Sequence, residues 1–224
     1  KITAKGARAI FYRQFLEYKK EKYFIFTKMT VLSAVVAFIF AYSLQKSVSD
    51  SSMAGFILLG VVAYVALIMS GYTGKWESEL KNPYIFLIPD SPLKKMWYAT
   101  LMEHVKAFAD GCIICIPIGI FWHVPVIEII YYILMSTVLQ ADRLYTMVIV
   151  QSLLGEVFGK TGQSLLRMFI QMALLGVGAG VGVLAAVLIS QTLIFPIVLI
   201  YGLMITVAMG AIALLRFDTM EQFV

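Results

Sequence analysis

Residues 168–215 read MFIQMALLGVGAGVGVLAAVLISQTLIFPIVLIYGLMITVAMGAIALL and contain no Asp, Glu, Lys or Arg. The polar group Ser190-Gln191-Thr192 divides this stretch into two apolar halves. Each half exceeds the about 20 residues that an α-helix needs to cross the hydrocarbon core of a bilayer. Neither half shows the alternation of apolar and polar residues that is typical of membrane β-barrel strands. The stretch therefore predicts two membrane-spanning helices joined by a short turn.

Four further apolar runs precede this pair, separated by polar segments. Hydrophobic residues make up 61% of the chain and charged residues 14%, and the mean hydropathy is +0.88. These values are typical of a membrane protein rather than a soluble domain. Because backbone groups that face lipid need partners within their own segment, we expect the spans to be helices. The prediction is an all-α, polytopic membrane protein that forms a single transmembrane domain over residues 1–224. Its six transmembrane helices are expected at about 26–44, 53–72, 107–121, 132–154, 166–189 and 193–215.

Residues 7–25 form an amphipathic pattern ahead of the first span. Ile10, Phe11, Gln14, Phe15 and Tyr18 recur at helical spacing on the mainly apolar face, whereas charged residues occupy another face. The pattern favours an N-terminal elbow helix that lies in the headgroup layer with its aromatic side toward the lipid. The alternative is a cytosolic extension of the first span.

Basic residues are distributed unevenly among the polar segments. Lys46 and Arg143 are exceptions; every other Lys and Arg lies in 1–28, 74–106, 155–167 or 216–224. Threading the six spans in order brings these four segments to one side of the membrane, and short segments rich in Lys and Arg stay in the cytosol. We therefore expect both termini to be cytosolic. The net charge of +5 is concentrated near the N-terminus, where attraction to anionic membrane lipid explains it without nucleic-acid binding.

The longest polar segment, 74–106, contains a second helix signal. Pro89 ends what precedes it, Asp90 or Ser91 can cap a new helix, and Pro92 suits the first helical position. From there apolar and aromatic residues recur on one face, while Lys94, Lys95 and Glu103 lie largely off it. A short amphipathic cytosolic helix over 91–104 is suited to docking in a groove of another protein. Alternatively, it caps its own bundle from below.

Two motifs in this segment carry a family resemblance. Gly-Lys-Trp-Glu-x-Glu at 74–79, followed by Phe-Leu-Ile-Pro-Asp-Ser-Pro-Leu-Lys-Lys-Met-Trp-Tyr-Ala-Thr at 86–100, resembles membrane subunits of the Putative ABC exporter family. The layout of elbow, six spans and a helix between spans 2 and 3 is similar to that of ABC-2-type permeases. Members of the family are often longer, so the resemblance leaves open whether the chain is part of a larger subunit.

The resemblance implies that one subunit spans the membrane and a separate subunit binds ATP. In such permeases a coupling helix sits in a cleft of a separate ATP-binding subunit and transmits its closure to the spans. Carried onto this chain, the coupling region is 74–106, and the ATPase-coupling interface comprises Glu77, Glu79, Ser91, Leu93, Lys94, Met96, Trp97 and Leu101. The chain has no Gly-x-x-x-x-Gly-Lys-Ser/Thr loop, so we expect ATP and Mg²⁺ on the partner ATPase. A second permease copy or half would complete a homodimer or pseudo-dimer.

A run of alternating glycines, Gly176, Gly178, Gly180 and Gly182, lies within the fifth predicted span. It contains two overlapping Gly-x-x-x-Gly frames, and glycine lets a neighbouring helix approach closely. Close helix packing is the favoured interpretation. A flexible point in a transport cycle is the alternative, because glycine also weakens a helix.

Asp142 and Arg143 lie within the fourth predicted span. Charged residues at membrane depth usually face the interior of a helix bundle and pair with other groups. Adjacent helical residues point in different directions, so each is expected to interact with another helix rather than with its neighbour. The pair either lines a translocation path or forms structural interactions.

The leading hypothesis is the permease subunit of an ATP-driven exporter for an amphipathic, lipid-like or peptide substrate, in a bacterial plasma membrane. An ATPase-independent secondary carrier or channel is the alternative, but such carriers show paired intramembrane charges in both halves. An integral membrane enzyme would need a catalytic constellation. We assign no catalytic, cofactor-binding or metal-ligating residues and expect no enzymatic activity in this chain.

Overall fold

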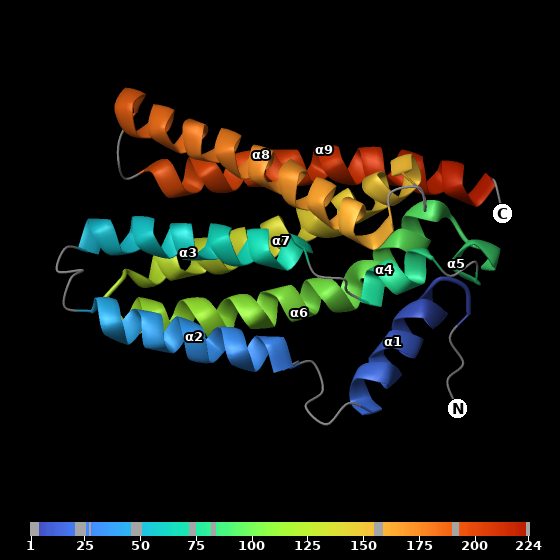
Figure 1. Ribbon diagram of the computed structural model, residues 1–224, viewed down its shortest axis with the longest axis horizontal. Coiled ribbons are helices and arrows are strands. Elements are labelled where there is room, and N and C mark those ends of the chain that lie inside the picture. The colour runs from blue at the N-terminus through green and yellow to red at the C-terminus, as the bar shows by residue number, and fades with distance from the viewer. Residues whose placement is uncertain are drawn as a thin grey trace.

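The computed structural model describes residues 5–20, 26, 28–45, 51–71, 75–81, 84–154, 159–189 and 193–222, and this part of the chain contains helices joined by turns and no strands (Figure 1). In chain order the helices are α1 (Arg8–Lys20), α2 (Lys28–Leu44), α3 (Ser51–Gly71), α4 (Lys75–Leu80), α5 (Tyr84–Leu87), α6 (Pro92–Phe121), α7 (Val126–Leu154), α8 (Gly159–Leu188) and α9 (Ile194–Gln222).

Four helices, α6 to α9, are long and apolar enough to cross a membrane. Each has 29 or 30 residues, which corresponds to about 45 Å and exceeds a hydrocarbon core of roughly 30 Å. Shorter apolar helices occupy Thr30–Leu44 in α2 and Ala54–Ile68 in α3, where the first two spans were predicted. Large apolar side chains face outward, among them Ile39, Val187 and Val207. The chain is therefore a multi-pass membrane protein.

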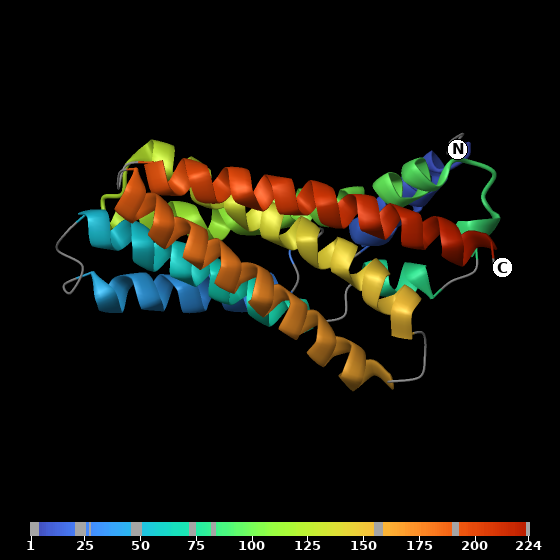
Figure 2. The same ribbon diagram turned by 90° about the horizontal axis from the view of Figure 1, so that it is seen from above.

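Helix α7 lies at the centre of the bundle and packs against α3, α6, α8 and α9. Figure 2 shows α8 crossing the other long helices obliquely, so that its first turns lie away from α9. One apolar core surrounds Leu58, Ile118 and Tyr132, and a second surrounds Trp76, Leu144 and Phe217. The second core lies at the end of the molecule that holds α1, α4, α5 and the end of α9 (Figure 1).

Helix α6 unites two elements that the sequence predicts separately. The expected amphipathic helix at 91–104 and the expected span at 107–121 form one uninterrupted helix. Ser91 is its N-cap residue and Pro92 its first residue, so the helix starts where the sequence predicts, although the Ser91 side chain makes no cap hydrogen bond. Nothing between them ends a helix, because a change in hydropathy does not interrupt the i to i−4 hydrogen bonds; even Pro117 lies inside the helix.

A capping turn at residues 122–124 ends helix α6. His123 has a left-handed backbone, with φ of 54°. The backbone N–H of His123 bonds to Ile120 O at 3.3 Å, and that of Val124 bonds to Gly119 O at 2.9 Å. This pair of bonds is the Schellman arrangement that satisfies the last carbonyl groups of a helix. After Pro125, α7 begins at Val126, so this helix starts before the span predicted at 132–154.

Helix α1 packs along the first half of α6. Its buried residues are Ile10, Gln14 and Tyr18, which belong to the predicted apolar face. Gln14 donates to Ala99 O at 3.0 Å, and the N–H of Ala7 donates to Asp90 Oδ2 at 3.1 Å. The N–H groups of Ala7 and Ser91 lower the pKa of Asp90, which supports an ionised carboxylate at this junction. Residues 21–25, at the end of the predicted elbow, lie outside the described residues.

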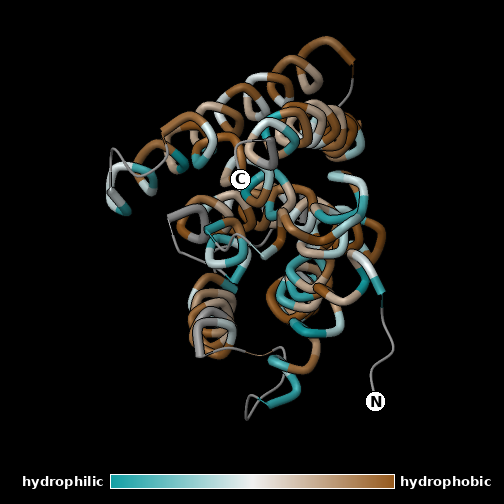
Figure 3. The backbone as a smooth tube through the Cα atoms, turned by 90° about the vertical axis from the view of Figure 1, so that its right-hand side faces the viewer, coloured by the Kyte–Doolittle hydropathy of each residue, from teal (hydrophilic) through white to brown (hydrophobic). Residues whose placement is uncertain are grey.

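Many hydrophilic residues gather at this same end of the bundle. Figure 3 views the molecule from that end and shows hydrophilic residues on helix ends near the viewer, with hydrophobic residues along the helices. The ends of α7 and α9 and the start of α8 lie on this side as well (Figure 1). The described residues near these helix ends, which belong to the basic segments of the sequence, therefore lie toward one end of the fold.

Candidate functional site

Four of the six residues of helix α4 are buried against other helices. Trp76 is fully buried, and its indole N–H donates to Leu144 O of α7 at 3.1 Å. Its ring stacks on Phe217 of α9, with ring centroids 6.4 Å apart. Phe86 of α5 contacts the same Phe217 ring at 5.1 Å. Trp76 therefore joins the segment between α3 and α6 to both α7 and α9.

The next residue, Glu77, forms a buried ion pair with α8. Arg167 Nη1 lies 2.8 Å from Glu77 Oε2, and both side chains are buried. Lys81 Nζ lies 2.9 Å from Glu77 Oε1. Burial alone would raise the pKa of Glu77, but hydrogen bonds from Lys81 and Arg167 outweigh burial and hold that pKa below its ordinary value. Glu77 is therefore a buried carboxylate with two cationic partners.

Two further charged residues, Glu79 and Lys95, bind groups within the protein near α4. Glu79 is buried and forms an ion pair with Arg13 of α1. The prediction that Lys95 lies largely off the apolar face of its helix is wrong for this residue. Its side chain is buried, and its ammonium group donates to Phe86 O at 3.1 Å. The aliphatic part of a lysine packs well against apolar neighbours when its charged end finds such an acceptor. We call Trp76, Glu77, Glu79 and Lys95 the α4 cluster.

The predicted ATPase-coupling residues separate into buried and accessible groups. Glu77, Glu79 and Met96 are buried, and Leu101 is half-buried. Leu93 is 58% exposed and Trp97 51% exposed, and Ser91 and Lys94 are exposed as well. Tyr84 and Leu87 of α5 are exposed apolar residues that the sequence did not single out. Their spacing of three residues on a short apolar helix is the signal that could have found them.

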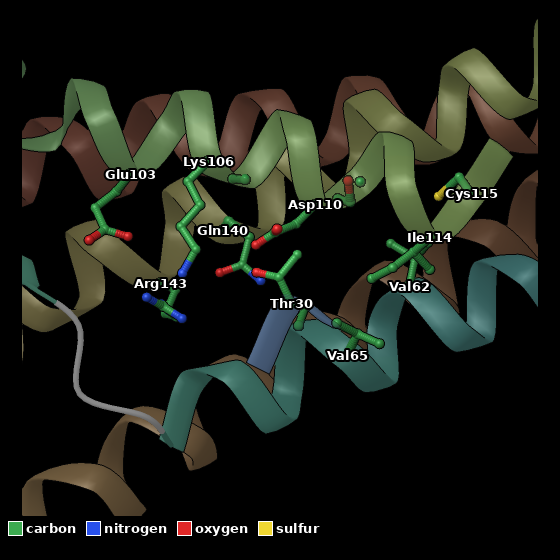
Figure 4. Close-up of a pocket in the computed structure, with 14 residues that line it drawn as sticks. Thr30, Val62, Val65, Glu103, Lys106, Asp110, Ile114, Cys115, Gln140 and Arg143 are labelled. Carbon is green, nitrogen blue, oxygen red and sulfur yellow. The ribbon is translucent and has the colours of Figure 1, made fainter. Parts of the chain in front are cut away.

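The α7 pair Asp142 and Arg143 points toward different neighbours. Arg143 lines a polar cavity of about 70 Å³ enclosed by α2, α3, α6 and α7. Figure 4 shows the side chains of Glu103, Lys106 and Asp110 of α6 around the same space. Two acidic and two basic side chains thus share this cavity, which has room for a few water molecules. The expectation that Asp142 and Arg143 would not pair with each other agrees with this arrangement.

Asp142 faces a different cavity from Arg143. It lines a larger cavity of about 380 Å³ whose walls come from α3, α7, α8 and α9. Leu139, Leu175 and Val198 are among its apolar lining residues. The two adjacent charged residues of α7 therefore face two different spaces, one polar and one mainly apolar.

The sequence matches one family almost from end to end. A family model described as Putative ABC exporter matches residues 1–221. This chain belongs to that family. Searches of curated proteins and of solved structures gave no match. Family membership and the apolar helices together make the protein a membrane component of an ABC exporter system.

The glycine run of this ABC exporter family member has two distinct faces. Gly178 and Gly182 are buried against α9, where an added Cβ would lie 3.0 Å from Tyr201 and 3.3 Å from Val198. Gly176 and Gly180 are exposed, and a Cβ there would have no neighbour within 4 Å. The Gly-x-x-x-Gly frame at 178/182 thus packs α8 against α9, whereas the frame at 176/180 faces outward.

Substitution of these glycines by leucine should affect stability differently on the two faces. Gly178→Leu forces side-chain atoms into Tyr201, so we expect it to destabilise the protein by about 1 to 3 kcal/mol. Gly176→Leu meets open space and removes a poor helix former, so we expect no loss of stability. Thermal unfolding in detergent, followed by circular dichroism, measures both. A larger loss for Gly176→Leu than for Gly178→Leu would contradict this assignment.

Proposed function

We propose that the chain is the permease subunit of an ABC-2-type exporter, powered by a separate ATPase subunit. In this proposal α2 and α3 cross the membrane with α6 to α9, which makes six spans, and α1 is the elbow helix. Both termini, α4, α5 and the start of α6 lie in the cytosol. The chain itself is not an enzyme, and ATP and Mg²⁺ bind to the partner.

The α4 cluster is the observation that carries this proposal. A segment between two spans could transmit force only if it were firmly attached to the bundle. Trp76 attaches it to α7 and α9, Glu77 attaches it to α8, and Glu79 attaches it to α1. A displacement of α4 would therefore reach the helices around both cavities.

Helix α6 offers a second route for the same displacement. Its first turns carry the exposed Leu93 and Trp97, and the helix continues without interruption to Phe121. Closure of the ATPase subunits against these exposed side chains would move a rigid helix about 45 Å long. The buried Glu77, Glu79 and Met96 would act beneath this surface, and Ser91, Lys94 and Leu101 would lie beside it.

We further propose that nucleotide-driven alternating access moves an amphipathic substrate outward. In this proposal the path runs near the apolar cavity lined by Asp142 and the polar cavity lined by Arg143. A homodimer or pseudo-dimer of permease halves, embedded in membrane lipid, would complete this path.

Loss of ATPase binding tests the docking surface. We expect Trp97→Asp, alone or with Leu93→Asp, to reduce co-purification of the ATPase at least tenfold, because a buried aromatic anchor commonly contributes about 2 kcal/mol or more to an interface. The measurement is the amount of ATPase that remains bound to tagged permease in detergent.

Val126→Asp is the matched control for this docking test. Val126 is also an exposed apolar residue, but it starts α7 at the opposite end of α6. We expect this variant to retain the ATPase. Undiminished binding by the Trp97 and Leu93 variants would reject the docking surface. Flux through the purified chain alone, without any ATPase, would instead favour a secondary carrier or channel.

A further inference from the structure

The cavity bounded by α3, α7, α8 and α9 has the size and chemistry of a ligand site. Its volume of about 380 Å³ falls within the range of small-molecule pockets, roughly 300 to 1,000 Å³. Gly60, Gly178, Gly182 and Gly202 contribute backbone rather than side chains to its lining. A Cβ added at Gly60 would have no neighbour within 4 Å, so the absence of a side chain there leaves space on the α3 side of the cavity.

Asp142 provides the only carboxyl group among the described residues that line this cavity. It is 1% exposed, and its Oδ1 has no hydrogen-bond partner among the described residues. None of the lysines and arginines in the described part of the chain forms an ion pair with it. Thr206 of α9 is the polar side chain beside the carboxyl group. The cavity thus contains one acidic group and no cation to balance it.

The other polar group in the cavity wall is already engaged. The Tyr201 hydroxyl donates to Leu174 O at 3.2 Å. Arg143, the residue adjacent to Asp142, lines the other, polar cavity. The Tyr201 hydroxyl oxygen can still accept a hydrogen bond, but among the described lining residues the one ionisable acidic group that a ligand would meet is the carboxyl group of Asp142.

The cavity also reaches the outer surface of the bundle. Phe56 and Gly60 of α3 and Val183 of α8 line it and are exposed on the surface that would face lipid. A molecule dissolved in the membrane could enter between α3 and α8 without first passing through water. This position suits a ligand that partitions into the bilayer.

We propose that this cavity is a binding site for a hydrophobic amine, whose ammonium group pairs with Asp142 and whose apolar body fills the space between α3, α8 and α9. A buried carboxyl group with one unsatisfied oxygen and no cationic partner among the described residues is costly, and an ammonium group both neutralises its ionised form and donates to it. A neutral hydrophobic molecule would leave the carboxyl group unmatched, and an anion would be repelled. This inference deepens the proposed function by naming a substrate class, and it rests on that function only for outward movement.

Photolabelling tests binding without ATP or an ATPase. The probe is a dodecylamine with a diazirine in its chain, and the neutral counterpart is the corresponding dodecanol. Both are added to protein in phosphatidylcholine nanodiscs, and labelled peptides are identified by mass spectrometry. We expect the amine to label cavity-lining peptides of α8 and α9 about tenfold more than the alcohol, as a charge-assisted hydrogen bond predicts.

Two variants and a matched control complete this experiment. Asp142→Asn should reduce amine labelling to the level of the alcohol. Gly60→Leu should reduce labelling by both probes, because a Cβ at Gly60 has no neighbour within 4 Å and its side chain would occupy the cavity. Gly176→Leu, which also meets open space but does not line the cavity, should label like the wild type.

Equal labelling by amine and alcohol would overturn the proposal, as would labelling outside the cavity or undiminished labelling of Gly60→Leu. If Asp142→Asn does not fold, the probe preference and the Gly60→Leu result decide the question. A failed ATPase docking test would leave these results unaffected, so the two proposals can fail separately.

Discussion

Glu77→Ala is expected to destabilise the protein by about 3 to 5 kcal/mol, because removing one partner of a buried ion pair leaves the other charge uncompensated. Glu77 is the ion-pair partner of Arg167 among the described residues. The Arg167 side chain is buried, and two of its nitrogen atoms already lack hydrogen-bond partners there. For a chain of this size such a change corresponds to a fall in the thermal midpoint of about 6 to 20 °C.

The reciprocal variant provides the sharpest control. Arg167→Ala should cost less than Glu77→Ala, because Glu77 keeps Lys81 as a cationic partner. The double variant Glu77→Gln with Arg167→Met removes both charges and should be more stable than Glu77→Ala. Thermal unfolding of all variants in the same detergent gives the order. If Arg167→Ala lowered the thermal midpoint more than Glu77→Ala, the inference that Glu77 is the central residue of this ion-pair network would be wrong.

Acid pH gives an independent readout of the same carboxylate. Since the pKa of Glu77 is lower in the folded state, the unfolded state binds more protons at this residue. Its contribution to stability is therefore fully present above its ordinary pKa of 4.5 and is lost as the pH falls through the lower folded value. Glu77→Gln should lack this part of the acid destabilisation.

Trp76→Ala is expected to have an effect of similar size, about 3 to 5 kcal/mol, because it empties a fully buried site between α7 and α9. The loss should appear as a lower thermal midpoint and as greater proteolysis at the end that holds α4 and α5. We also expect weaker coupling of ATP hydrolysis to transport, since α4 would lose its attachment to two long helices.

Trp76→Phe separates packing from hydrogen bonding. Phenylalanine keeps an aromatic ring against Phe217 but cannot donate to Leu144 O, so the expected loss is about 1 kcal/mol, apart from a smaller change in packing. Equal stability of Trp76→Ala and the wild type would show that the second apolar core does not depend on this side chain.

The sequence predicted the helices better than it predicted their roles. Apolar runs long enough to span a bilayer located α6 to α9 and the apolar parts of α2 and α3. The Ser91-Pro92 cap signal placed the start of α6 correctly. Local sequence governs such features, because capping and the length of an apolar run depend on neighbouring residues. The continuity of α6 was missed because polar and apolar turns can share one helix.

The sequence did not predict which way particular side chains point in the folded protein. The motif at 74–79 suggested an interface with another protein, whereas Trp76, Glu77 and Glu79 point into the chain's own bundle. Residues distant in sequence, including Leu144, Arg167 and Phe217, provide their partners. Asp142 and Arg143 are adjacent in the chain, and only the packing of α7 directs them to separate cavities.

Composition and the spacing of apolar residues alone determined that this is an all-helical protein of the membrane, because burial in lipid demands long apolar segments with internally paired backbones. Only the tertiary structure decided which charged residues are buried together and where open space remains between the helices. These features depend on contacts between segments far apart in the chain, and the helical pattern of any one segment is compatible with many such arrangements.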